Sequence, residues 1–149
     1  MSIIFREARR DEVMTVVAML RDDALGAARE GAAESEYLAA FDAMQAAGGN
    51  RLIVGVEVDD IVATYQLTFI SGLSLRAALR AQLESVRVAS DRRGQGLGHA
   101  LIADAEARSR AAGCALMQLT MNSTREQTNR FYQQLGFVPS HIGFKRDLT

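Results

Sequence analysis

The chain has 149 residues, 48% of them hydrophobic and 23% charged, which is the composition of a globular protein and excludes a disordered or membrane-spanning one. At this length a single domain, residues 1–149, buries about 70% of the surface of the unfolded chain. Seventeen basic and eighteen acidic residues give a net charge of −1, so no overall field collects nucleic acid or anionic lipid, and we expect neither partner.

The cysteine count and the first residues of the chain indicate whether disulfides or metal sites form and where in the cell the protein is found. The single cysteine, Cys114, excludes an intrachain disulfide, and with only His99 and His141 beside it we expect no metal site. The chain starts without a signal-type apolar run and contains no apolar stretch approaching 18 residues. We therefore expect a cytoplasmic protein.

The first half of the chain predicts a strand, two helices and a hairpin. Residues 2–8 are rich in β-formers, and Asp11 is placed to cap the helix that follows. Residues 34–47 predict a second helix, which Gly48 ends. Residues 51–70 predict a β-hairpin turning at two aspartates.

The second half begins with a connector, 71–82, which we expect to be mobile because it is short for an independent helix. The elements expected after it are a strand at 83–88, a helix at 97–112 closed by Gly113, a strand at 114–121, a helix from Thr124 to Leu135 closed by Gly136, and one or two short strands within 137–148. This order predicts a mixed sheet, antiparallel at first, with a parallel crossover.

A glycine-rich turn joins the strand at 83–88 to the helix that follows. Gly94, Gly96 and Gly98 carry no Cβ, so the backbone can adopt positive φ and approach a ligand closely. The helix adds the positive end of its dipole and its unpaired first-turn N–H groups. Arg92 and Arg93 supply formal charge, so the turn reads as a phosphate-binding site.

Three interpretations of this turn compete. A P-loop needs Gly-Lys followed by Ser or Thr, and here Gly98-His99 stands instead. A dinucleotide-binding turn needs its glycines directly after the strand and an acidic residue ending the next strand, but Ala89–Arg93 intervene and the next strand ends in Met121-Asn122. The third interpretation is a turn that binds no ligand. It is disfavoured because three glycines lose much backbone entropy on folding, and a turn without a ligand does not need all three.

The stretch Arg93-Gly94-Gln95-Gly96-Leu97-Gly98 resembles motif A of the GNAT superfamily of acetyl-CoA-dependent N-acetyltransferases, Arg/Gln-x-x-Gly-x-Gly/Ala. The preceding strand Glu84–Val88 also matches, and the segment Asn129–Phe137 resembles the family's asparagine and Phe-Tyr-x-x-x-Gly-Phe motif. The two motifs lie about 35 residues apart with a strand and a helix between, which makes the resemblance specific.

The resemblance implies an α+β fold, with a mixed, mostly antiparallel sheet that splays into a V and about four flanking helices. It also implies transfer of the acetyl group of acetyl-CoA, without a metal, to a primary amine of a small molecule or peptide, by direct attack in a ternary complex. Homodimers are common in the family. The alternatives are transfer of another acyl group, or a coenzyme-A-binding regulatory module without efficient catalysis.

The resemblance also implies where the donor binds. The pyrophosphate would lie on the turn and the pantetheine arm beside the strand as an added strand, where a β-bulge would aim an amide at the thioester carbonyl. The residues expected at this site are Val86, Arg87, Val88, Arg93, Gly94, Gln95, Gly96, Leu97, Gly98, Asn122 and Asn129. Asn122 is equally suited to capping a turn.

Two residues are candidates for proton transfer. Tyr132 aligns with the family's tyrosine, and a phenol with a reference pKa of about 10 can protonate the thiolate at neutral pH, although Tyr132 would also pack well between Phe131 and Phe137. Glu84 stands where several members carry a catalytic glutamate. A carboxylate with an ordinary pKa of about 4.3 is a weak base toward an alkylammonium of about 10.4, so Glu84 either acts with help or only orients the substrate.

The acceptor cannot be identified from the sequence, since loops build its site. Asp22 and Asp23, in the loop that walls the acceptor site in the family, are either receptors for a cationic amine or solvated side chains. The connector is a second candidate wall. For His99, Cys114 and His141 we expect structural roles.

Overall fold

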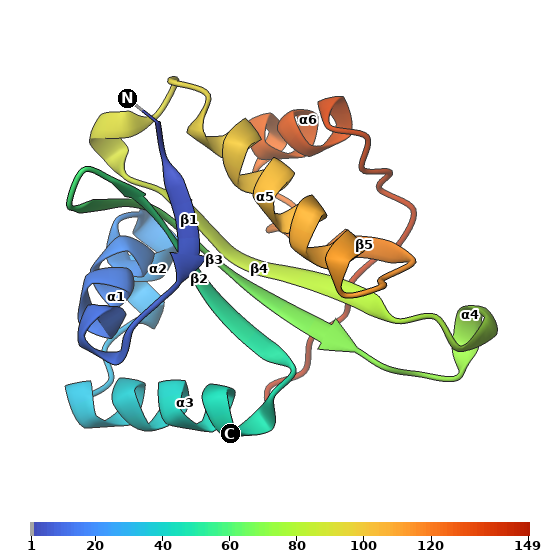
Figure 1. The fold of residues 1–149 in the computed structure, drawn as a ribbon, viewed down its shortest axis with the longest axis horizontal. Helices are drawn as coiled ribbons and strands as arrows, with labels where there is room; N and C mark the ends of the chain where they lie inside the picture. The colour runs from blue at the N-terminus through green and yellow to red at the C-terminus, as the bar shows by residue number, and fades with distance from the viewer. Residues whose placement is uncertain (1) are drawn as a thin grey trace.

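A computed structural model describes residues 2–149 and contains one open sheet with strands in the order β1-β2-β3-β4-β5. The first four strands pair antiparallel and β5 pairs parallel to β4 (Figure 1). The strands are β1 (Ile4–Glu7), β2 (Asn50–Glu57), β3 (Asp60–Ile70), β4 (Arg80–Val88) and β5 (Leu116–Leu119). A mixed, mostly antiparallel sheet is therefore confirmed.

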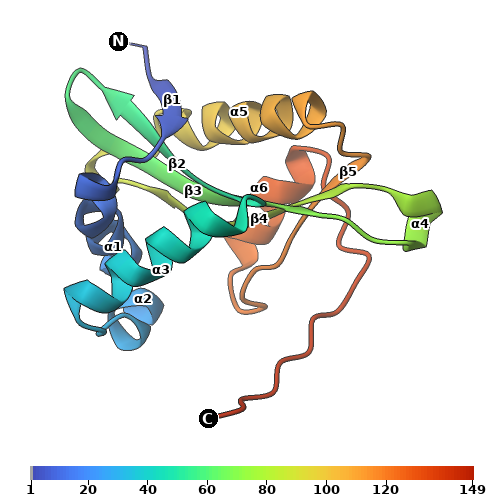
Figure 2. The same cartoon turned by 60° about the horizontal axis from the view of Figure 1, so that its bottom comes forward.

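Helices cover both faces of the sheet, with α5 on one side and α1 and α3 on the other (Figure 2). The helices are α1 (Val13–Arg21), α2 (Ala24–Arg29), α3 (Glu34–Ala47), α4 (Ser74–Ala77), α5 (Leu97–Ala111) and α6 (Glu126–Gln134), with single 3₁₀ turns at Arg10–Glu12 and Ser90–Arg92. Since α2 and α4 are one or two turns long, four longer helices flank the sheet, as expected.

The larger core lies between the sheet and α5. Its residues alternate along the strands, as period-two burial requires, and they include Leu67 and Leu83, which are fully buried. Tyr65 donates a hydrogen bond of 2.6 Å to Asp104, and Arg108 binds the same carboxylate at 2.7 Å. This buried contact attaches α5 to the middle of the sheet.

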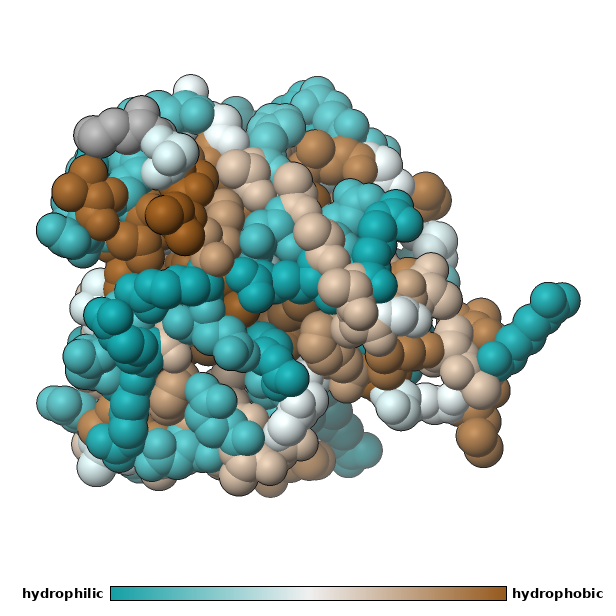
Figure 3. All heavy atoms as spheres, in the orientation of Figure 1, coloured by the Kyte–Doolittle hydropathy of each residue, from teal (hydrophilic) through white to brown (hydrophobic). Residues whose placement is uncertain are grey.

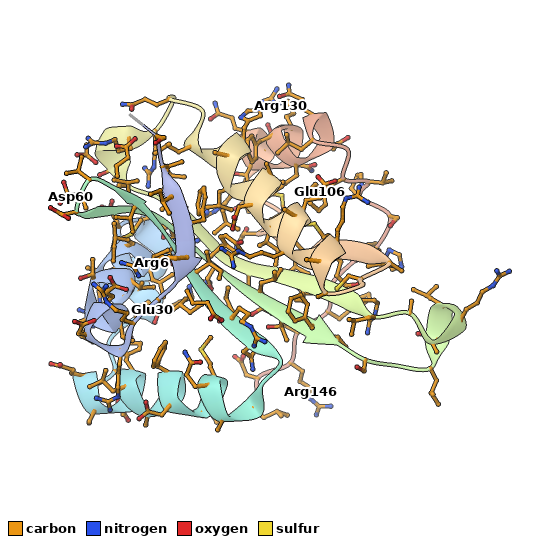
Figure 4. All side chains as sticks on the ribbon, in the orientation of Figure 1. Arg6, Glu30, Asp60, Glu106, Arg130 and Arg146 are labelled. Atoms are coloured by element: carbon orange, nitrogen blue, oxygen red, sulfur yellow. The ribbon has the colours of Figure 1, made fainter. Side chains whose placement is uncertain are left out.

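The opposite face is held by α1 and by an ion pair at the end of β1. Val16 of α1 packs on Val54 of β2. Arg6 binds both carboxylate oxygens of Glu12 at 2.9 and 2.6 Å, and the Arg9 N–H binds the same group at 2.8 Å. The residue that binds at the start of α1 is therefore Glu12, and not Asp11 as predicted. Its partner Arg6 is labelled in Figure 4.

Most helix ends agree with the sequence. Helix α3 spans the predicted residues, and Gly48, Gly113 and Gly136 have φ of 73°, 85° and 91° after α3, α5 and α6. Left-handed backbone at these positions is what glycine permits without strain. The hairpin also forms, but Val58 and Asp59 occupy its turn and Asp60 pairs with Glu57.

Four expectations were wrong in detail. The short helix α2, capped by Asp23, forms inside the predicted loop. The strand β4 begins at Arg80, so part of the connector is strand. Helix α6 begins at Glu126 without a side-chain cap from Thr124. The predicted strands after residue 136 do not form in the described chain, where 137–149 run free as an extended tail (Figure 2).

Candidate active site

The strand β4 is interrupted by a β-bulge near its middle. Thr64 pairs with Arg87 and Gln66 with Glu84, so two residues of β4, Ser85 and Val86, stand opposite one residue of β3. Ser85 has φ of 54°, an uncommon conformation for a residue other than glycine. The bulge that the resemblance implied is therefore present.

Beyond the bulge, β4 has a free edge. Its first four residues, 80–83, pair with β5, whereas residues 84–88 pair only with β3 because β5 ends at Leu119. The two parallel strands thus separate into a V. The backbone N–H and C=O groups along one side of 84–88 are left for a ligand that runs as an added strand.

The glycine turn follows this free edge after the 3₁₀ turn at Ser90–Arg92. Gly94 and Gly96 have φ of 77° and 80°, and helix α5 starts at Leu97. Nothing lies within 4 Å of a Cβ built on either glycine, so the turn is open on that side. The first N–H groups of α5 have no partner within the helix, which makes this turn suited to an anion.

Gly98 has a packing role that its sequence position did not indicate. It lies inside α5 with negative φ, and a Cβ there would come within 3.1 Å of the Phe131 ring on α6. A glycine at this position lets α5 and α6 approach closely. The helix ends that carry the turn and Tyr132 are thereby held together.

The two arginines of the turn also differ. Arg92 binds Glu57 at 3.1 Å and Asp91 at 3.3 Å, so its charge is already compensated. Arg93 is exposed and has no ion pair with any residue from 2 to 149. The formal charge available to a ligand at the turn therefore comes from Arg93 alone, a correction to the expectation for Arg92.

Tyr132 is 9% exposed and packs edge-on against Phe131 and Phe137, with ring centroids 5.3 and 5.6 Å away. Burial raises the pKa of the phenol, while Arg87 and Arg125 act in the opposite direction. The hydroxyl therefore stays protonated at neutral pH and lies near two guanidinium groups. Tyr132 therefore packs in the core and also carries a protonated phenol, so the two interpretations are compatible.

The bulge brings Glu84 and Arg87 to the same face of β4. Their partners Gln66 and Thr64 are two residues apart on β3 and share the face that α1 covers further along the sheet. Without the extra residue of the bulge, side chains three apart in a strand would point to opposite faces. Glu84 is exposed there, whereas Arg87 is half-buried.

Asp23 is not a free receptor for a cation. Its carboxylate accepts the N–H of Gly26 at the start of α2, and its Oδ2 lies 3.5 Å from Nε of Arg87 and 3.2 Å from Nη2 of Arg125. These contacts hold the pKa of Asp23 below its usual range, with the Gly26 hydrogen bond as the largest cause. Asp22 is exposed.

Arg125 is the site residue that sequence reasoning missed. It stands just before α6, seven residues before Tyr132, and its charge acts on the Tyr132 hydroxyl. That spacing was the available signal. Arg130, by contrast, points to solvent from the outer side of α6 (Figure 4).

The two asparagines make local contacts, Asn122 in the turn before α6 and Asn129 inside α6. The Asn122 carboxamide oxygen accepts from Thr124 N and Oγ1 at 3.0 and 2.6 Å, which is the turn-capping role considered for it. Asn129 accepts from Gln133 at 2.6 Å. His99 is exposed and contacts the edge of Phe131.

Other parts of the molecule lie away from this site. The connector 71–79 projects from the far end of β4 as an arm, with exposed apolar side chains at its tip (right of Figures 1 and 3), so it does not wall the site. Two surface hollows of about 350 and 390 Å³ contain none of the expected site residues. Among residues 2–149, no helix is long and apolar enough to cross a membrane, and no His, Cys, Asp and Glu cluster is suited to a metal.

Comparisons with known proteins agree with this arrangement. The sequence model of the acetyltransferase (GNAT) family matches residues 15–137. An aminoalkylphosphonate N-acetyltransferase of Salmonella typhimurium is 36% identical over 67 residues, 45% of this chain and 44% of that protein, so the match spans less than half of that relative.

Two solved structures are similar over nearly the whole chain. A crystal structure named as a transcriptional regulator from Bacillus halodurans C-125 is 38% identical, with a TM-score of 0.93 over 99% of this chain and 100% of that one. A putative acetyltransferase from Agrobacterium tumefaciens is 26% identical, with a TM-score of 0.86 over 97% and 99%.

Proposed function

Because the chain belongs to the acetyltransferase (GNAT) family, we propose that it transfers the acetyl group of acetyl-CoA to a primary amine by direct attack in a ternary complex. The observation that carries the proposal is the position of one protonated phenol, Tyr132, close to the open edge of β4 and the glycine turn. A donor lying along that edge would bring its sulfur to this phenol.

The chain's own groups fit such a donor. The turn 93–98 and the start of α5 would hold the pyrophosphate, with Arg93 as the free cation. The edge at Val86 and Val88 would hydrogen-bond the pantetheine amides, and the bulge leaves a backbone N–H without a ladder partner to stabilise the thioester oxygen. The amide nitrogens of Asn122 and Asn129 remain available to the same arm.

The chemistry needs two proton transfers. The amine nitrogen, once neutral, bonds to the acetyl carbon, the carbon–sulfur bond breaks, and the departing thiolate takes a proton from Tyr132. The proton lost by the amine goes to solvent, through Glu84 or directly, and the Tyr132 phenolate takes a proton from solvent before the next turnover. Glu84 is exposed at the bulge, on the acceptor side of β4, so a water can lie between it and the amine.

The test is release of free thiol from acetyl-CoA with a panel of amines. The proposal predicts amine-dependent thiol release and lines that intersect when both substrates are varied. A binding module without catalysis would instead show thermal stabilisation by acetyl-CoA and no thiol release. If an acyl-CoA with a longer chain reacts faster than acetyl-CoA, the identity of the transferred acyl group changes and the rest of the proposal stands. The named activity of the Salmonella relative puts aminoalkylphosphonates on the panel.

The tail also supports a homodimer. Its side chains Ile142, Phe144 and Leu148 are 82, 92 and 92% exposed and would share one face of an extended strand, which Arg146 interrupts. The outer edge of β5 has no partner strand in the described chain. In the proposed homodimer, the tail of each copy pairs with the β5 edge of the other.

A further inference from the structure

The acceptor side of β4 contains a small group of charged side chains that the proposed donor site does not use, since Arg87 is expected to meet the donor through its backbone only. Arg87 comes from β4, Asp23 from the start of α2 and Arg125 from the start of α6. The Oδ2 atom of Asp23 lies between both guanidinium groups, 3.5 Å from Nε of Arg87 and 3.2 Å from Nη2 of Arg125. Three elements far apart in sequence thus meet at one carboxylate.

The charges at this point do not balance. Two guanidinium groups face one carboxylate, which leaves a net charge of +1, and the other oxygen of Asp23 is already taken by the Gly26 N–H. Arg29 on α2 is near enough to act on Arg87 as a third cation. Two or three cations around one carboxylate leave room, electrostatically, for one more anion.

One nitrogen of Arg87 also lacks a hydrogen-bond partner. Its side chain is 15% exposed, and its Nε is the one buried side-chain nitrogen or oxygen without a hydrogen bond among residues 2–149. Nη1 binds only the carbonyl of Val86, at 2.9 Å. An incompletely paired buried guanidinium is costly, and groups of this kind in folded proteins ordinarily bind a ligand or water.

The location of the group links it to the reaction. Glu84 lies on the same face of β4 as Arg87, and Arg125 directly precedes α6, the helix that carries Tyr132. The Arg87 guanidinium lowers the pKa of Tyr132, so the two groups share one electrostatic environment. An anion held by Arg87 and Arg125 would therefore lie next to the acid that serves the thiolate.

We infer that the acceptor is an amine that also carries an oxyanion group, a carboxylate or a phosphoryl-type group, held by Arg87 and Arg125 opposite Asp23. This inference rests on the proposed function. It is the opposite of the alternative considered for Asp22 and Asp23, in which they attract a cationic acceptor. Guanidinium groups pair with carboxylate and phosphoryl oxygens through two parallel hydrogen bonds, so they would orient the amine as well as bind it.

The experiment compares acceptors that differ in the group carried besides the amine: an anion in β-alanine and 2-aminoethyl phosphate (the anionic amines), a neutral hydroxyl in ethanolamine and a second amine in 1,3-diaminopropane. We expect kcat/KM to be at least about tenfold higher for one or both anionic amines than for ethanolamine, and lowest for the diamine. The better anionic amine distinguishes a carboxylate from a phosphoryl site. Equal rates with all four, or a preference for the diamine, would overturn the inference.

Variants separate recognition from folding. In Arg87→Gln and Arg125→Gln the ratio of anionic to neutral kcat/KM should fall toward one, through a rise in the KM of the anionic amine. The control Arg10→Gln removes an exposed arginine that binds Asp42 on α3 and should leave the ratio unchanged. A ratio that survives both site variants would contradict the inference.

Binding covers the case in which no transfer is seen. Calorimetric titration of the two anionic amines and ethanolamine, with coenzyme A present, should give heat for an anionic amine with the wild-type chain and none with Arg87→Gln. Absence of turnover with such binding would count against the proposed function alone. Failure of both anionic amines to bind would count against the inference.

Discussion

Tyr132 is the residue on which the proposed chemistry depends, and its surroundings suit a proton donor. Two aromatic rings bury it and raise its pKa, while the guanidinium groups of Arg87 and Arg125 would favour the phenolate that forms when it gives up a proton. The ring is positioned by its contacts with Phe131 and Phe137, and the two arginines act on the pKa of its hydroxyl. A substitution that keeps the ring therefore tests the hydroxyl alone.

We predict that Tyr132→Phe lowers kcat by about 100-fold or more, which is the usual contribution of a general acid, with little change in acetyl-CoA affinity. Steady-state rates and a binding titration of the donor measure the two effects. Tyr37→Phe is the matched control, because it removes a hydroxyl that binds Glu30 away from β4 and should leave kcat unchanged. A Tyr132→Phe enzyme with normal kcat would remove this residue from the mechanism.

At the scale of elements, the joint between β1 and α1 depends on the nearly buried carboxylate of Glu12. Hydrogen bonds from Arg6 lower the pKa of Glu12 from 4.5 to about 2. A folded-state pKa below the unfolded one contributes stability that is present above about pH 4.5 and is lost as pH falls toward 2. The shift corresponds to about 3 kcal/mol.

We predict that Glu12→Gln lowers the free energy of unfolding at pH 7 by about 3 kcal/mol and flattens its decline between about pH 5 and 3. Urea unfolding at a series of pH values measures both. Asp42→Asn, which breaks an exposed ion pair with Arg10, is the control and should cost much less. Parallel pH profiles for wild type and Glu12→Gln would show that this ion pair does not drive acid unfolding.

The contact between α5 and α6 gives a second prediction for elements. Gly98→Ala should gain up to about 1 kcal/mol of helix propensity but lose a comparable amount to the clash with Phe131, whose ring lies 3.1 Å from the new Cβ. In a Phe131→Leu background the clash is relieved, so the same substitution should become stabilising. A double-mutant cycle on unfolding free energies measures this coupling.

Gly96→Ala is the control for that cycle. A Cβ at Gly96 meets nothing within 4 Å, but its φ of 80° makes alanine cost about 1–2 kcal/mol whatever residue stands at 131. No coupling with Phe131→Leu is expected there. Zero coupling for Gly98 as well would mean that α6 moves freely to accept the methyl group.

Much of the element order could be predicted from the sequence, and the exceptions have physical causes. The helix at 34–47 and the glycines that end three helices follow local rules, so they were found. Helix α2 was not predicted because its six residues are too few to show helical periodicity. The tail alternates as a strand does, but a strand also needs a partner edge, which a sequence does not show.

The candidate site likewise has parts that could be predicted from the sequence and parts that could not. The glycine turn and Tyr132 lie in motifs and could be predicted. The contact of Asp23 with Arg87 and Arg125 joins positions that lie 64 and 102 residues apart in sequence, so only the fold brings them together. Gly98 was assigned to ligand approach because its contact with α6 could not be anticipated from its motif.

At the scale of the whole molecule, the tail and the free edge of β5 predict association. Deleting residues 140–149, or changing Phe144 to Glu, should convert a dimer into a monomer, because three exposed apolar side chains each gain about 1.5–3 kcal/mol on burial. Sedimentation equilibrium measures the mass. Leu73→Glu, on the arm at 71–79, is the control and should leave the dimer intact. A wild-type monomer at high concentration would contradict the tail's proposed role.

The central claim is that acetyl moves from acetyl-CoA directly to an amine nitrogen, and the most direct measurement follows the acetyl group itself. With carbon-13-labelled acetyl-CoA and the best amine of the panel, product analysis by mass spectrometry and NMR should find one labelled N-acetyl group for each free thiol released. Thiol release without an N-acetyl product, or no release with any amine, would contradict the claim.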